Sequence, residues 1–201
     1  VALARADEAE SLPEPFTELV DVERTWRQPS TDLATRSVAL LDGDDLVAYV
    51  LVGRRGRLDA VVPQSWRGRG IGRALLDRAM SIARAHGDDE VSQTVPVGSA
   101  AQRFLEVAGA RPTYDAWILE LPHGRAVADQ SLPDGFALGE GRPDETVTVH
   151  RVIEDAFNEW PERRPTSFAD WSADFLEGDE AAPWRCRVVR DRAGEVVGVA
   201  M

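Results

Sequence analysis

The residues best suited to chemistry are Arg-Gly-Arg-Gly-Ile-Gly at positions 67–72, between an apolar run and a helical pattern. Closely spaced glycines let backbone amides converge, and the N-terminus of the following helix adds a partial positive charge. This arrangement suits a diphosphate group. A P-loop is excluded, because its motif ends in lysine followed by serine or threonine and the chain contains no lysine.

A dinucleotide-binding turn is excluded as well. Its motif, G-x-G-x-x-G or G-x-G-x-x-A, requires glycine or alanine where this chain has Arg73 or Leu75. Asp88 and Asp89 are spaced as a ribose-binding acid would be, but they precede the next expected strand instead of ending it.

The six residues fit a third motif, Arg/Gln-x-x-Gly-x-Gly/Ala, which binds pyrophosphate in the GNAT acyl-CoA N-acyltransferases. The elements expected around the motif also follow the order of that family, strand–strand–strand–loop–helix–strand–helix–strand. The chain therefore resembles the GNAT family from its first hairpin to residue 121. The resemblance implies an α/β GNAT fold, in which helices flank a mixed central sheet, and acetyl-CoA as the co-substrate.

In that family the loop and the first helical turn bind pyrophosphate, and the preceding strand splays from its neighbour to bind the pantetheine arm. The first motif arginine helps to shape the loop, and a side chain at either of the last two glycines would hold the backbone away from the phosphates. The alternatives are a buried core strand at residues 60–62 and solvated arginines beside a turn. By resemblance, the cofactor-binding residues are Ala60, Val61, Val62, Arg67, Gly68, Arg69, Gly70, Ile71 and Gly72.

Hydrophobic spacing predicts the elements that position this loop. In the first module, at residues 1–121, we expect helices at 7–25, 71–86 and 100–108, and strands at 36–41, 46–53, 57–62, 90–95 and 116–121. Residues 122–133 are polar and bounded by prolines, which predicts a linker. Beyond it we expect a strand at 136–138, helices at 144–157 and 167–176, and two strands around a turn at 191–194.

The chain departs from the family pattern where many members carry a catalytic tyrosine. Gly98 stands in place of the usual Asn, and Leu105 in place of the Tyr that protonates the leaving thiolate. Tyr114 is near in sequence, but nothing in the sequence brings its hydroxyl to the thiolate. Asp59, on the expected cofactor strand, is a candidate general base, although an exposed carboxylate without a role is the simpler interpretation.

The C-terminal hairpin resembles the first one, because residues 46–51 and 196–201 each follow a turn with Asp and Gly and then an acidic residue. This predicts an internal repeat, although any two hairpins share some features. Residues 134–201 would then be an incomplete second module, as in tandem members such as the mycothiol synthases, and the chain should continue past Met201. Trp160 lies in a stretch that resembles the acceptor-site region of such a second module.

Composition narrows the function further. A net charge of −12 argues against a nucleic-acid partner, and no apolar run is long enough to span a membrane. Cys186 is the only cysteine, which favours a cytoplasmic setting, and three distant histidines predict no metal site. We therefore expect transfer of an acetyl group from acetyl-CoA to a primary amine of a small molecule. The alternatives are acetylation of a thiol-bearing amine, as in mycothiol synthases, and a non-catalytic acyl-CoA-binding module.

Overall fold

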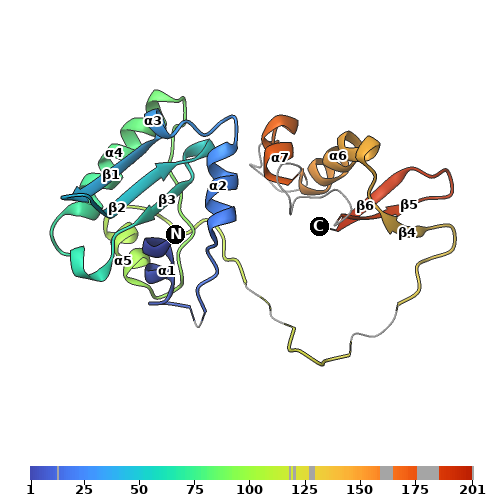
Figure 1. Cartoon of the computed structure of the whole chain (residues 1–201), viewed down its shortest axis with the longest axis horizontal. Helices are drawn as coiled ribbons and strands as arrows, with labels where there is room; N and C mark the ends of the chain where they lie inside the picture. The colour runs from blue at the N-terminus through green and yellow to red at the C-terminus, as the bar shows by residue number, and fades with distance from the viewer. Residues whose placement is uncertain are drawn as a thin grey trace. The chain divides into compact units, whose positions relative to one another are not determined.

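The computed structural model describes residues 1–12, 14–117, 119, 121–126, 130–158, 165–175 and 186–200. The chain divides into two compact units, Val1–Asp115 and Ala116–Met201 (Figure 1). Trp160 and Met201, on which two of the sequence expectations depend, lie outside the described residues. Within those residues no helix is long and apolar enough to cross a bilayer.

The sheet of the first unit consists of three antiparallel strands in the order β1-β2-β3. Their bounds are Ser37–Asp42, Asp45–Val52 and Leu58–Val61, which agrees with the strands expected at 36–41, 46–53 and 57–62. The central strand β2 is buried on both faces over most of its length, as its nearly continuous apolar sequence predicts. It therefore forms the centre of the unit's core.

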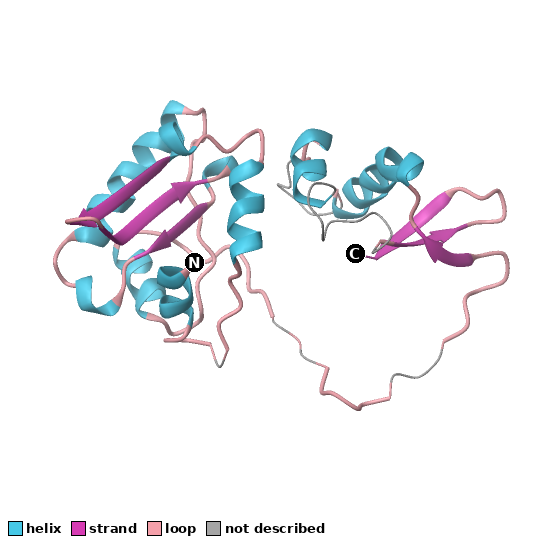
Figure 2. Ribbon diagram, in the orientation of Figure 1, coloured by secondary structure: helices cyan, strands magenta, loops and turns pink. Residues whose placement is uncertain are grey.

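Helix α4 (Ile71–Ala85) covers one face of this sheet, as Figure 2 shows. Its buried residues recur every four positions and pack against alternate residues of β2 and the start of β3. The residues that form this core are Ala48, Val50, Val52, Leu58, Leu75, Ala79 and Ala83. Since α4 begins directly after the glycine-rich loop, its packing fixes where the loop lies relative to the sheet.

The N-terminal region differs from the single helix expected at 7–25. It forms two helices, α1 (Ala2–Glu8) and α2 (Leu19–Arg27), and the described residues between them belong to no helix. The backbone amides of Phe16 and Thr17 both donate to the Glu8 carboxylate, at 3.0 Å each, and the Thr17 hydroxyl donates to it too. These bonds satisfy amides that a continuous helix would have paired internally. The short helix α3 (Leu33–Arg36) then leads into β1.

Two expected strands are not formed in the described part of the first module. At 90–95 the chain makes only an isolated parallel bridge, Arg57 with Ser92, and helix α5 (Ala100–Val107) follows. Within 116–121 the described residues lie outside any strand, and Trp117 and Leu119 are almost fully exposed. In the part of the first module that the structure describes, the mixed sheet expected from the resemblance is an antiparallel sheet with one parallel bridge, because strand pairing depends on distant partners that a local pattern does not reveal.

The second unit contains a sheet in the order β4-β5-β6 and two helices. The strands are Ala137–Glu140, Arg187–Arg190 and Val196–Ala200, and the helices are α6 (Thr146–Phe157) and α7 (Phe168–Phe175). These positions agree with the expected elements to within one or two residues. Their core is formed by Val149, Trp171, Cys186, Val188 and Val196.

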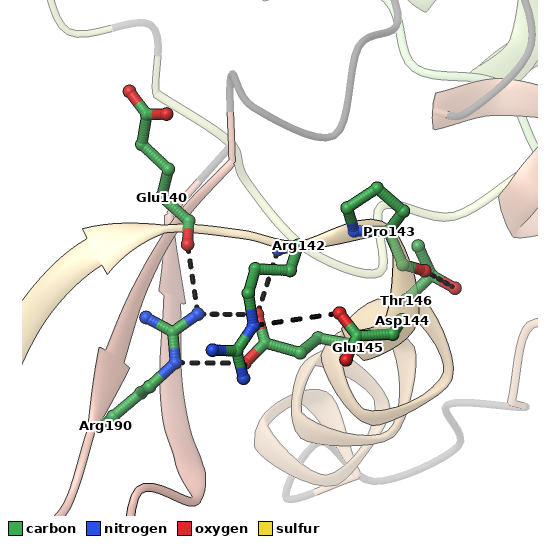
Figure 3. Close-up of polar contacts among 7 residues, drawn as sticks. All are labelled: Glu140, Arg142, Pro143, Asp144, Glu145, Thr146 and Arg190. Carbon is green, nitrogen blue, oxygen red and sulfur yellow. Dashed lines mark hydrogen bonds and ion pairs between the residues drawn. The ribbon is translucent and has the colours of Figure 1, made fainter.

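A buried carboxylate joins the start of α6 to β5 (Figure 3). Glu145 accepts two hydrogen bonds from Arg190, from Nε at 2.9 Å and Nη2 at 2.5 Å, and a third from the backbone amide of Arg142 at 2.9 Å. The hydrogen bonds from Arg190 hold the pKa of Glu145 below its usual range. Within the unit this pair ties helix and sheet together.

Candidate functional site

The glycine-rich loop presents an uncapped helix N-terminus to open space. Gly68 and Gly70 have φ values of +74° and +82°, a left-handed conformation that favours glycine. Gly70 is the N-cap of α4, and no side chain caps that end of the helix. A Cβ at either glycine would meet no atom within 4 Å. The first-turn amides of α4 therefore face a space that an anion can enter.

Gly72 differs from Gly68 and Gly70, because its backbone conformation does not require glycine. A Cβ at this position would lie 3.5 Å from the tip of the Phe104 ring on α5, an ordinary contact distance. The requirement for glycine in this loop therefore comes from the backbone conformation at positions 68 and 70, and the sequence did not distinguish these positions from 72.

Arg67 shapes the loop and is held by protein groups. Its Nε donates to the carbonyl of Val62 at 2.8 Å, which closes the turn between β3 and α4. Its Nη1 donates to Glu10 at 2.6 Å and its Nη2 to Asp7 at 2.8 Å. Burial nevertheless raises the pKa of Asp7, with Arg67 acting in the opposite direction. These contacts agree with a loop-shaping role and direct the guanidinium towards the N-terminal segment.

Arg69 is the more available cation of the loop. Its guanidinium carbon lies 4.7 Å from the centre of the Trp66 ring, and the residue is exposed. Among the described residues no carboxylate forms a salt bridge with it. Stacking on the ring orients this charge without neutralising it.

Strand β3 has one edge paired with β2 and an outer edge that opens along its length. The amide of Leu58 donates to the carbonyl of Ser92 at 2.7 Å, but among the described residues the carbonyl of Ala60 receives only the side-chain amide of Gln93, at 3.3 Å. Since alternate residues of a strand face the same edge, the amides of Ala60 and Val62 also face this opening. Among the described strands none pairs with this edge, whereas the side chain of Val61 is buried.

The sheet face opposite α4 carries a polar pair. The Tyr49 hydroxyl on β2 donates to Asp59 Oδ1 on β3 at 3.1 Å. Asp59 is exposed on one side and crowded by protein on the other, and this partial burial raises the pKa of its carboxyl. Burial likewise raises the pKa of Tyr49 above its usual value. Alternation along the strands could have placed both residues on one face, but the sequence alone gave no reason to pair them.

Other candidate residues lie elsewhere. Tyr114 is 69% exposed. Cys186 is buried in the core of the second unit, where burial raises the pKa of its thiol. The His150 ring packs against Trp171 in that same core. In the described part of the chain no three histidine, cysteine or acidic side chains form a group that could hold a metal ion.

Comparison with solved structures finds related folds. A GCN5-related N-acetyltransferase from Sphaerobacter thermophilus superposes with a TM-score of 0.72 at 22% identity, over 98% of this chain and 65% of that one. This chain thus spans slightly less than two thirds of that protein. Weaker matches are a tetramutant of the BH1408 protein from Bacillus halodurans and a fungal protein. The first has a TM-score of 0.44 and 20% identity, over 60% of this chain and 88% of that one. The second is a GCN5-related glucosamine N-acetyltransferase region of a multi-domain GH3 β-N-acetylglucosaminidase, with a TM-score of 0.46 and 18% identity, over 77% of this chain and 21% of that one.

Comparison of sequences gives the family directly. No curated protein matches the chain significantly. The model of the Acetyltransferase (GNAT) family matches residues 3–110, which is more than half of the chain and includes the loop, β3 and α4. The chain therefore belongs to the GNAT acetyltransferase family.

Proposed function

We propose that this protein is an acyl-CoA-dependent N-acyltransferase that moves an acetyl group from acetyl-CoA to a primary amine of a small molecule. The observation that carries the proposal is the uncapped N-terminus of α4, preceded by two left-handed glycines. Family membership supports the transferase class. In this proposal the amine attacks the thioester directly, without a covalent enzyme intermediate.

The loop would hold the pyrophosphate of the cofactor. That group carries about two negative charges, which the first-turn amides and dipole of α4 would attract. Arg69 would add a full positive charge, because it remains exposed and has no carboxylate partner among the described residues. Gly68, Gly70, Ile71 and Gly72 would contribute backbone, and Arg67 would act through the shape of the loop.

The pantetheine arm would lie along the open edge of β3. There the amides of Ala60 and Val62 face outward, the Val62 carbonyl is held by Arg67, and Gln93 occupies the Ala60 carbonyl with a long bond of 3.3 Å. A ligand amide could replace this side chain at little cost, because one hydrogen bond would be exchanged for another. Val61 would support the arm through its buried side chain.

A second candidate, a tandem protein with its acceptor site in another module, is favoured by the two hairpins. In β1–β2 the register shifts between Leu40 and Leu41, and in β5–β6 it shifts between Val189 and Arg190, each time close to the turn. We therefore propose a first module at 1–121, a linker at 122–133 and a related second module at 134–201. On this reading the activity could be that of mycothiol synthases, and the first module could bind acyl-CoA without catalysis, in agreement with Leu105 at the usual tyrosine position.

Calorimetric titration of acetyl-CoA tests the loop. Gly70→Glu should abolish measurable binding, because its carboxylate would stand in the open space before the helix N-terminus. Gly43→Glu is the matched control, since Gly43 has a similar φ of +63°, equally open surroundings and a place in the distant β1–β2 turn. Equal affinity in the two variants would refute the loop assignment. Release of the CoA thiol over a panel of amines then separates transfer from binding alone.

A further inference from the structure

Tyr49 and Asp59 form an arrangement that the family assignment does not explain. They lie on neighbouring strands, on the face opposite α4, and are joined by the 3.1 Å bond from the tyrosine hydroxyl to Asp59 Oδ1. The second oxygen, Oδ2, has no hydrogen-bond partner within the described ranges, and the residue is exposed. Asp59 also directly precedes Ala60, on the strand whose outer edge is open.

We propose that Asp59 is the general base that deprotonates the acceptor ammonium and that Tyr49 positions it, an assignment that rests on the proposed function. Tyr49 fixes the carboxylate by one oxygen and leaves the other free to receive a proton. A phenylalanine would fill the same place in the sheet, so the hydroxyl is explained by this bond and not by packing.

The chemistry balances with these two residues. Asp59 Oδ2 takes one proton from the ammonium, which leaves a neutral amine with a free electron pair. The amine nitrogen attacks the thioester carbonyl carbon, the C–N bond forms, and the C–S bond breaks with its electrons on sulfur. The second nitrogen proton passes to that thiolate to give the CoA thiol, and Asp59 returns its own proton to solvent.

The partial burial of Asp59 suits this role. Burial raises the pKa of the carboxyl and Glu8 of α1 acts in the same direction, whereas the Tyr49 hydrogen bond and Arg57 lower it. A base with a raised pKa holds a proton more firmly and is closer to the working pH. The rate should therefore rise with pH through the titration of this carboxyl.

The test compares Asp59→Asn and Tyr49→Phe with the wild type in thiol release from acetyl-CoA with an amine. Asp59→Asn should lower kcat about 100-fold or more and leave calorimetric acetyl-CoA affinity unchanged. Tyr49→Phe should cause a smaller loss and move the acidic limb of the pH–rate profile to higher pH, because the ionised carboxylate loses a hydrogen bond. The matched controls are Asp45→Asn, an exposed acid on the same sheet, and Tyr114→Phe, the other tyrosine.

A ¹³C titration of the Asp59 carboxyl provides a readout that needs no turnover. In Tyr49→Phe its pKa should rise, and an unchanged value would overturn the role of Tyr49. Full activity in a folded Asp59→Asn variant would overturn the role of Asp59 and leave the proposed function intact. A wild type that binds no acetyl-CoA, or transfers to no amine, would overturn both proposals.

Discussion

Gly56 provides a sharp test of how the outer edge of β3 is built. It has a φ of +68°, and an added Cβ would lie 2.0 Å from the carbonyl oxygen of Glu90 and 3.2 Å from the Cα of Val91. Both neighbours are backbone atoms, so no side-chain rotation can relieve the contact. Gly56→Ala must therefore displace the segment whose Ser92 bridges to Arg57, directly before β3.

The expected cost has two parts. A left-handed conformation costs an alanine about 1–2 kcal/mol. Displacement of the segment also breaks two bonds, from Leu58 N to Ser92 O at 2.7 Å and from Ser92 N to Gly56 O at 3.0 Å, at about 1 kcal/mol each. The sum, roughly 3–4 kcal/mol, is a large part of the stability of a small domain.

Comparison with Gly43→Ala isolates the cost of displacing the segment. Gly43 shares the left-handed conformation, at a φ of +63°, but a Cβ there would meet nothing within 4 Å. The difference between the two variants should be about 2 kcal/mol, or about 1 M in urea midpoint. Urea unfolding followed by the amide signals of β2, such as that of Val50, reports the first unit alone. Equal losses in the two variants would refute the argument from the close approach.

Two further outcomes follow from the ion pairs. Glu145→Gln should destabilise the second unit by on the order of 2 kcal/mol, because a buried carboxylate loses charge-assisted bonds from Arg190. The pKa of Glu145 in the folded protein lies below its usual 4.5, so its carboxylate contributes fully to the free energy of unfolding above that pH and loses this contribution as the pH falls. The urea midpoints of the wild type and Glu145→Gln should therefore converge in acid. Arg67→Met should raise hydrogen exchange throughout α1, which loses its bonds to the loop, whereas Arg73→Met, whose salt bridge is with its own helix, should not. Unchanged exchange in Arg67→Met would show that α1 is held by other contacts.

The parts of the fold that the sequence predicted are those with local causes. Helix α4 begins at the expected residue and ends one residue early. The prediction was this close because apolar spacing and the following Gly87 are local signals. The first hairpin is confirmed because the turn around Gly43 lies between two apolar runs. The strand expected at 90–95 was wrong for the opposite reason, since a strand forms only where a distant edge accepts it, and the described residues of 116–121 likewise lie outside any strand.

The same distinction applies to the site. The family could be predicted from six residues, since glycines at positions 68 and 70 meet a local backbone requirement. The partners of Arg67 could not, because Asp7 and Glu10 lie 60 and 57 residues away in the sequence. Likewise the pairing of Tyr49 with Asp59 requires the register of β2 and β3, which no pattern within either strand specifies.

The contacts of Arg67 determine how charge is divided near the loop. One guanidinium faces two carboxylates there, so this part of the first unit carries a net negative charge and cannot itself attract pyrophosphate. The attraction must then come from the α4 N-terminus and Arg69, a short-range source, since dipole effects fade within the first helical turn. The N-terminal segment contributes the opposite field: Asp7 and Glu8 both act electrostatically on Tyr49, and Glu8 also acts on Asp59. At Asp59 itself Arg57 acts in the opposite direction and more strongly than Glu8, so in the proposed reaction the Asp59 carboxylate would have to hold the acceptor ammonium largely by its own charge.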